Sequence, residues 1–231
     1  MKRGFPLLVV LLTIFSLAQG DREAEITAEP HHHLVLQNQY VRVFKVEVAP
    51  QEQILVHRHR YDYVFVTLGA SEIENAVVGK APAVLKLQDG DTRFLQGNFS
   101  HSVKDLAKTP FRNVTVELLQ DEKSRKPFKW DEERGLHILE GGTQDILFVE
   151  DGVRVSDIQL QPGGSIPKHR HAGPHLVVSL TDYELRSDVV GKGSKTMQQK
   201  AGDVSWVPGG YTHVLTNSGK QPARFITLEF H

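Results

Sequence analysis

The stretch GGSIPKHRHAGPH, residues 163–175, and the stretch QEQILVHRHRYDY, residues 51–63, decide how this chain is organised. They lie 112 residues apart and carry the triplet His-Arg-His at the same place. The same offset relates further segments, which are Val77-Val78-Gly79-Lys80 with Val189-Val190-Gly191-Lys192, Gly90-Asp91 with Gly202-Asp203, and His101 with His213. Self-similarity at one fixed offset indicates a duplicated unit, so the chain is predicted to contain one domain twice.

Both copies are expected to be all-β. Apolar and polar residues alternate in short runs, and Pro-Gly-Gly, Gly-Asp and Asn-Ser-Gly turn signals separate these runs. This period of two is typical of strands, and many short strands predict a small sandwich or barrel in each copy. We place the domains at residues 21–120 and 136–231. Residues 121–135 are expected to be a solvated linker because ten of the fourteen positions from Asp121 to Arg134 are charged.

Residues 1–20 have the features of a secretory signal peptide. Met1-Lys2-Arg3 precedes an apolar run from Phe5 to Ala18, and the small residue Gly20 follows. The run is shorter than the roughly 20 residues that a permanent membrane-spanning helix needs. We therefore expect cleavage and a periplasmic or secreted protein, with an uncleaved anchor as the alternative.

The overall composition excludes several kinds of chemistry. The chain has 27 Lys+Arg against 28 Asp+Glu and a formal net charge of -1, so no global field would recruit nucleic acid or an anionic membrane. It has no cysteine, which excludes disulfides, thiolate nucleophiles and cysteine-bound metals. The 12 histidines stand out, and any bound metal must use histidine or oxygen ligands.

The histidines of the second copy are spaced like metal ligands. His169 and His171 are two residues apart on a predicted strand, so their side chains share one face. His175 has the same parity, and His213 follows 42 residues after His171. Neutral imidazoles suit divalent first-row metals such as Fe, Zn, Mn, Ni, Cu or Co. Four converging histidines therefore predict a metal site.

The first copy repeats three of these positions as His57, His59 and His101, with Tyr63 where His175 stands. Three ligands would leave open positions for water, dioxygen or substrate. Tyr63 could serve as a catalytic proton donor, or it could be an ordinary half-buried strand residue. Paired histidines on an alternating strand can also be surface residues, and the first site can have degenerated after duplication.

The second copy resembles the cupin family. Its Gly163, His169, His171 and His175 are similar to the first cupin motif, whose last position is normally Glu, and Gly202-Asp203 with Pro208, Gly210 and His213 is similar to the second. The resemblance extends to both copies, about residues 31–120 and 136–231. It implies a bicupin with two tandem double-stranded β-helix (jelly-roll) barrels, each able to hold a divalent transition metal.

Departures from the cupin pattern are concentrated in the first copy. There Gln51, Tyr63, Gln96 and Asn98 replace the motif Gly, Glu, Pro and Gly. Asn tolerates the left-handed backbone that this last Gly position uses, so the turn can survive. In the second copy His175 replaces the Glu, which would make an all-histidine site with a net positive charge.

Function within this family cannot be taken from the fold. We expect a secreted metal-dependent bicupin, a dioxygenase-type oxidoreductase acting on a small organic substrate, with the second copy as the primary site. The alternatives are a Lewis-acid isomerase, lyase or cyclase that uses the four-histidine site, a non-catalytic metal- or small-molecule-binding protein, or a metal carrier. Assembly into a homo-oligomer is left open.

Other polar residues are interpreted as structural. Arg42 with Glu117, and Arg154 with Glu229, recur near the first and last strands of each copy and are expected to pair across strands or to line the cavity. Arg58 and Arg170 should face away from the metal. The run from His31 to His33 is expected to be a solvated tail, with metal scavenging as the alternative.

Overall fold

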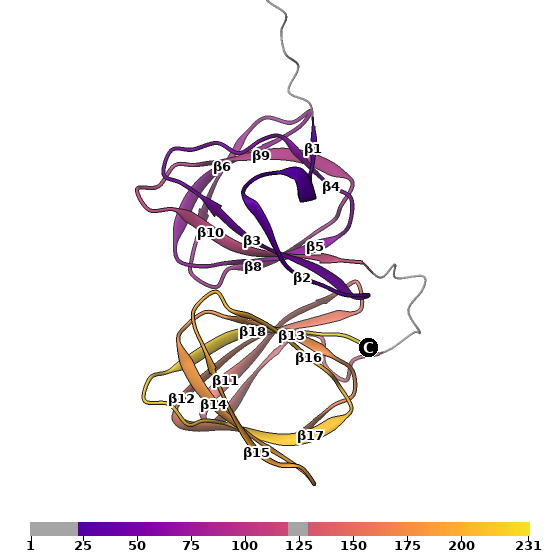
Figure 1. Cartoon of the computed structure of the whole chain (residues 1–231), viewed down its shortest axis with the longest axis vertical. Coiled ribbons are helices and arrows are strands. Elements are labelled where there is room, and N and C mark those ends of the chain that lie inside the picture. The colour runs from indigo at the N-terminus through magenta and orange to yellow at the C-terminus, as the bar shows by residue number, and fades with distance from the viewer. Residues whose placement is uncertain (1–22, 120–128) are drawn as a thin grey trace, which may run out of the picture.

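Strands dominate the computed structural model, which describes residues 23–119 and 129–231 (Figure 1). The all-β prediction is confirmed for these residues, in which one short 3-10 helix is the single helical element. None of their helices is long and apolar enough to cross a membrane. The expected signal peptide, residues 1–20, and residues 121–128 of the expected linker lie outside the described residues.

The first half of the chain forms two five-stranded sheets, with the orders β1-β4-β9-β6-β7 and β2-β3-β10-β5-β8. Its elements are β1 (Ala24–Glu25), η1 (Ile26–Ala28), β2 (His32–Gln37), β3 (Val41–Val48), β4 (His57–His59), β5 (Tyr63–Thr67), β6 (Ser71–Val77), β7 (Ala83–Leu87), β8 (Thr92–Leu95), β9 (Phe99–Asp105) and β10 (Phe111–Leu118).

The second half forms one eight-stranded sheet with the order β15-β14-β17-β12-β18-β13-β16 and with β11 paired to β12. Its strands are β11 (Gly135–Glu150), β12 (Val153–His171), β13 (His175–Ser179), β14 (Tyr183–Val189), β15 (Gly193–Gln199), β16 (Val204–Val207), β17 (Tyr211–Asn217) and β18 (Ala223–Glu229).

Strand pairing repeats at the offset of 112 residues. His57 pairs with His101 and His169 with His213, while Arg42 lies opposite Glu117 just as Arg154 lies opposite Glu229. The two halves differ mainly in continuity, because β12 runs unbroken through the region that forms both β3 and β4 in the first half. The duplicated sequence therefore folds into two copies of one strand arrangement.

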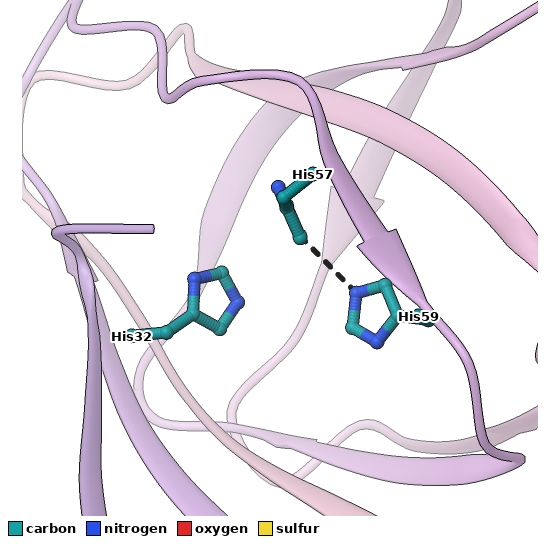
Figure 2. Close-up of side chains that lie close together, drawn as sticks. All are labelled: His32, His57 and His59. Carbon is teal, nitrogen blue, oxygen red and sulfur yellow. Dashed lines mark hydrogen bonds between the residues drawn. The ribbon is translucent and has the colours of Figure 1, made fainter. Parts of the chain in front are cut away.

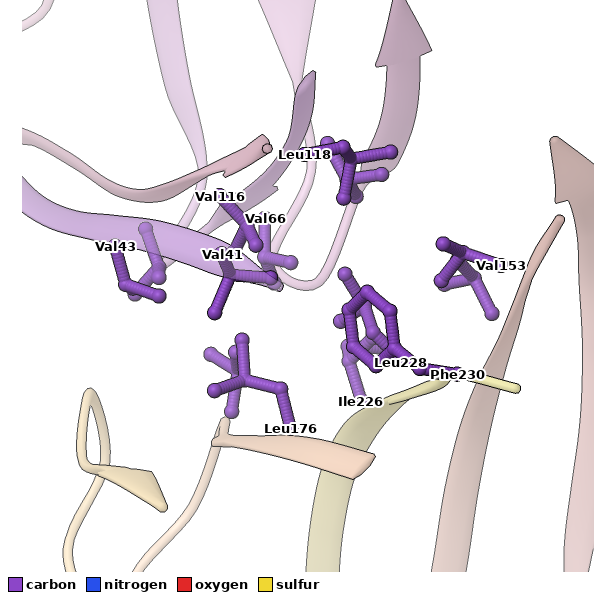
Figure 3. Close-up of a cluster of buried hydrophobic side chains, with 14 of the residues drawn as sticks. Val41, Val43, Val66, Val116, Leu118, Val153, Leu176, Ile226, Leu228 and Phe230 are labelled. Atoms are coloured by element: carbon purple, nitrogen blue, oxygen red, sulfur yellow. The ribbon is translucent and has the colours of Figure 1, made fainter. Parts of the chain in front are cut away.

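The two halves share a buried apolar core. Valines of β3 and β10 pack there against residues of β13 and β18, and Figure 3 shows Val41 and Val116 facing Leu176 and Leu228. The other face of each sheet covers a separate core within its own half, built around Phe44 in the first half. Sheets buried on both faces explain why Val41 and Phe44 are both fully buried on one strand.

Candidate metal centres

Three histidines of the second half point their Nε2 atoms at one another. His169 and His171 lie at the end of β12, where the period of two puts both rings on one face, and His213 lies opposite His169 on β17. The Nε2 atoms are 2.9 Å apart between His169 and His171, 3.2 Å between His171 and His213, and 3.0 Å between His213 and His169. The predicted ligands therefore converge.

The Nδ1 atoms of this triad are each held by an oxygen. The partners are the carbonyl of Pro167 for His169 at 2.8 Å, the Glu229 carboxylate for His171 at 3.3 Å, and the Ser187 hydroxyl for His213 at 2.6 Å. A carbonyl or carboxylate accepts only, so Nδ1 of His169 and His171 carries the proton and Nε2 carries a lone pair. Partners of this kind set the tautomer and orientation of metal-binding histidines.

A divalent metal fits this arrangement. Unprotonated Nε2 atoms facing one another at 3.0 Å repel unless a cation lies between them. Three nitrogens about 2.1 Å from one centre and at right angles would be about 3.0 Å apart, whereas tetrahedral ligands would be about 3.4 Å apart. The observed spacings match the first case, so a metal held by these three residues would have further coordination positions for other ligands.

Burial favours the neutral form of His169 and His213, which is the form that ligation requires. Desolvation is the main cause that lowers the pKa of His213 to about 3, and it also lowers the pKa of His169. The neighbouring imidazoles add to the effect at both residues. A neutral imidazole is the form that binds metal.

His175 is not brought into the triad. Its ring stacks on that of His171 with centroids 4.1 Å apart and planes at 23°, and the group whose nitrogens come together contains His169, His171 and His213 alone among the described residues. Its Nδ1 is buried and has no hydrogen-bond partner among the described residues. His175, the expected fourth ligand, thus stacks on the ring of His171 and does not join the converging nitrogens.

The first half repeats the triad with His57 and His59 on β4 and His101 on β9. The Nε2 of His59 lies 3.2 Å from that of His57 and 3.1 Å from that of His101. Nδ1 of His57 donates to the Leu55 carbonyl at 3.0 Å, and Nδ1 of His101 lies 2.7 Å from the Asn75 amide oxygen. Burial lowers the pKa of His57 to about 4 and that of His101 to about 3.

Tyr63 occupies the first-half position that His175 occupies in the second. Its ring stacks on His59 with centroids 4.1 Å apart and planes at 17°. Tyr63 is buried rather than half-buried, and burial raises its pKa. The structure therefore places this candidate proton donor beside a metal-ligand candidate, as a packed side chain.

The run from His31 to His33 was expected to be a solvated tail, and for His32 this is wrong. His32 is buried, and its nitrogen groups with those of His57 and His59 within 4.8 Å. Figure 2 shows it reaching from β2 toward these two histidines on β4. Sequence reasoning missed it because its position depends on how the preceding segment packs. The acid at Glu29, three residues earlier, is the one local signal.

The arginine–glutamate pairs form as expected. Arg42 Nε donates to Glu117 at 2.7 Å, and Arg154 Nη2 donates to Glu229 at 2.6 Å. They differ in their contact with the histidines, because Glu229 also holds His171 whereas Glu117 Oε1 and His59 Nδ1 are buried without hydrogen-bond partners among the described residues. Among the described residues, the glutamate of the arginine pair thus contacts a triad histidine in the second half and not in the first.

The cavities beside the two triads differ in size. The second-half cavity is about 550 Å³, and the first-half cavity is about 100 Å³. Part of the cause is side-chain volume, since Phe65 and Phe111 of the first half correspond to Val177 and Ala223 of the second. The second cavity has room for an organic ligand, whereas the first has room for little beyond a few water molecules.

Comparisons with known proteins identify the fold. No protein-family model matches the chain, and no curated protein matches its sequence. Among solved structures it is similar to oxalate decarboxylase of Bacillus subtilis, described with Mn(II) centres, with a TM-score of 0.61, 14% identity and coverage of 83% of this chain and 69% of that one. It is also similar to the oxalate decarboxylase formate complex of Lactobacillus farciminis, with a TM-score of 0.62, 13% identity and coverage of 86% of this chain and 84% of that one. The fold is that of a cupin.

The predicted metal chemistry agrees with the geometry of this fold. Both histidine groups can hold a divalent transition metal, and the identity of that metal stays open. The structural neighbours are enzymes that act on a small substrate, oxalate. Their low identity to this chain shows a shared fold, so the reaction has to be argued from the residues of the site.

Proposed function

We propose that this cupin is a metal-dependent enzyme whose active site is the His169–His171–His213 triad, and that it is a dioxygenase-type oxidoreductase acting on a small organic substrate. One observation carries the proposal: three imidazoles converge beside a cavity of about 550 Å³ while His175 lies outside the group. A redox-active ion bound there would offer coordination positions for both an organic substrate and dioxygen.

The chain's own residues would orient the site. Glu229 holds the Nδ1 proton of His171, and its own pKa is held at about 2 because contacts with His171 and Arg154 outweigh the effect of burial. The carboxylate therefore stays ionised at neutral pH and keeps His171 in the tautomer that offers Nε2. The Ser187 hydroxyl, 2.6 Å from Nδ1 of His213, fixes the orientation of that ring.

The cavity favours an organic anion larger than oxalate. Its walls include Leu139, Ile158 and Leu185, and Lys192 and Lys195 also line it. Neither lysine forms an ion pair with a described residue, so both charges are available to a ligand. A two-carbon acid would leave most of this apolar volume unfilled, so the proposed substrate is a carboxylic acid or enol with an apolar body.

We also propose that each half is a complete jelly-roll barrel, with domains at residues 21–120 and 136–231, and that the protein acts in the periplasm or outside the cell. The matching strand order of the halves supports the first point. The pattern of residues 1–20 supports the second.

Oxygen consumption tests the proposed reaction. Iron-loaded protein is expected to consume dioxygen when aromatic or medium-chain carboxylic acids are added, and the zinc-loaded protein is expected to consume none because zinc has no redox chemistry. An oxygen electrode with a panel of such acids measures this. Metal that raises the melting temperature without any turnover across the panel would support a binding protein in place of an enzyme.

Substrate size is tested by binding. Manganese-loaded protein should bind an acid with an apolar body, such as 3-phenylpropionate, at least about tenfold more tightly than oxalate, because each buried CH₂ contributes about 0.8 kcal/mol. Calorimetric titration of both acids gives the ratio. Replacing Leu185 with Gln should reduce the preference, and equal affinities in the unaltered protein would contradict the proposed substrate class.

A further inference from the structure

The N-terminal segment of the described chain is packed across the first half. Ala24 pairs in parallel with His57 on β4, and its amide donates to the Val56 carbonyl at 2.9 Å. Ile26 is 1% exposed and belongs to the first-half core. The segment therefore docks by an apolar anchor before the chain turns back along β2.

Behind this anchor, a buried acid holds two histidines. Glu29 is 2% exposed and accepts hydrogen bonds from Nδ1 of His32 at 2.7 Å and from Nδ1 of His31 at 3.0 Å. The Nδ1 of His32 is thereby occupied, which leaves its Nε2 to face His57 and His59. A carboxylate on the far nitrogen is the usual arrangement of a metal-binding histidine.

We propose that His32 is a metal ligand and that it completes a closed, structural four-histidine site with His57, His59 and His101, for which Glu29 is the positioning residue. Tyr63 stacks on His59 and supplies no ligand from the position that His175 holds in the second half. The adjoining cavity of about 100 Å³ is well below the roughly 300–1,000 Å³ of ordinary small-molecule pockets. Four protein ligands and no open position are typical of structural rather than catalytic sites.

The second half shows what happens without this segment. Gln144 has the register of His32, since it lies opposite Ile158 as His32 lies opposite Val46. Ile138, which corresponds to Ile26, is 77% exposed instead of 1%. Ile138 is therefore not inserted as an anchor. Because Gln144 stands at the position of His32, this side of the second site supplies no fourth histidine.

The proposal requires that first-site metal binding depends on His32. In the full-length chain carrying His171→Ala, which isolates the first site, His32→Ala is expected to weaken Zn²⁺ binding by more than about 100-fold, and Glu29→Gln by about 10–100-fold. His33→Ala is the matched control, because His33 is the exposed neighbour on the same strand; it should leave the affinity unchanged. Competition with a chromophoric chelator measures all four proteins.

Hydrogen exchange provides a second readout. Zn²⁺ should slow exchange of the amides of residues 24–33 in the His33→Ala protein and leave it unchanged in the His32→Ala protein. Unaltered zinc affinity in a folded His32→Ala protein would overturn the proposal. If the His32→Ala protein fails to fold, two other results together would overturn the proposal. These are an unchanged zinc affinity in the Glu29→Gln protein and, in the His33→Ala protein, exchange of the amides of residues 24–33 that does not depend on zinc. Neither readout depends on whether the second site is catalytic.

Discussion

Replacing His171 with alanine is expected to remove the metal from the second half and leave the first half loaded, so that the metal content falls from two ions per chain to one. His171 contacts both other ligands, with its Nε2 2.9 Å from that of His169 and 3.2 Å from that of His213. Its loss leaves two imidazoles and removes the group that Glu229 orients. Proposed enzyme activity should fall to the background rate.

Elemental analysis of the purified protein measures this change. His137→Ala is the matched control, because His137 also lines the second cavity but lies outside the triad and pairs with Glu132 at 2.7 Å. That variant should keep both ions. An unchanged metal-to-chain ratio in His171→Ala would rule out the triad as the ligand set.

The triads could be predicted because their geometry follows from local rules. On any strand, residues two apart share a face, so His169 and His171 had to point the same way. His169 pairs with His213 on β17 as His57 pairs with His101 on β9. The third histidine recurs at the same spacing in both copies, and this repetition was the sequence evidence that it approaches the other two. The repeat and its alternation predicted a small sandwich or barrel in each copy, and the resemblance to the cupin motifs added the double-stranded β-helix.

The fate of His32 and His175 could not be predicted in this way. His175 has the correct parity, but its ring stacks on His171, and such a rotamer choice depends on the packing of the whole site. His32 lies beside the first triad in a segment that is anchored by Ile26 in the core and by the pairing of β2 with β3. The corresponding Ile138 does not insert, although the two residues are chemically identical. Tertiary packing decides between these outcomes.

The metal-free protein is expected to unfold between about pH 6 and pH 4. Burial lowers the pKa of His57 to about 4 and those of His101, His175 and His213 to about 3. The unfolded chain binds these protons near pH 6.5 and the folded chain does not, so the stability that is fully present above pH 6.5 is lost as the pH falls. Each such histidine removes up to about 1.4 kcal/mol per pH unit, against a typical total of about 5–15 kcal/mol.

Carboxylates act in a lower pH range and can be told apart from the histidines. Burial raises the pKa of Glu29 and that of Glu229, but contacts with His32 and His31 at Glu29, and with His171 and Arg154 at Glu229, outweigh burial and lower each pKa to about 2. Their contribution is present above their unfolded pKa near 4.5 and is lost only below it. A loss of stability that begins near pH 6.5 therefore belongs to the histidines.

Urea unfolding of chelator-treated protein at pH 7, 6 and 5 measures the slope. His175→Phe keeps a ring stacked on His171 and removes one titrating group, so it should reduce the slope by about one proton per molecule. His33→Gln, at an exposed position outside both triads, should leave the slope unchanged. Zn²⁺ should preserve the folded state to lower pH, because a nitrogen that binds metal cannot bind a proton. Stability that is constant from pH 7 to pH 5 without metal would mean that these imidazoles are not buried as neutral groups.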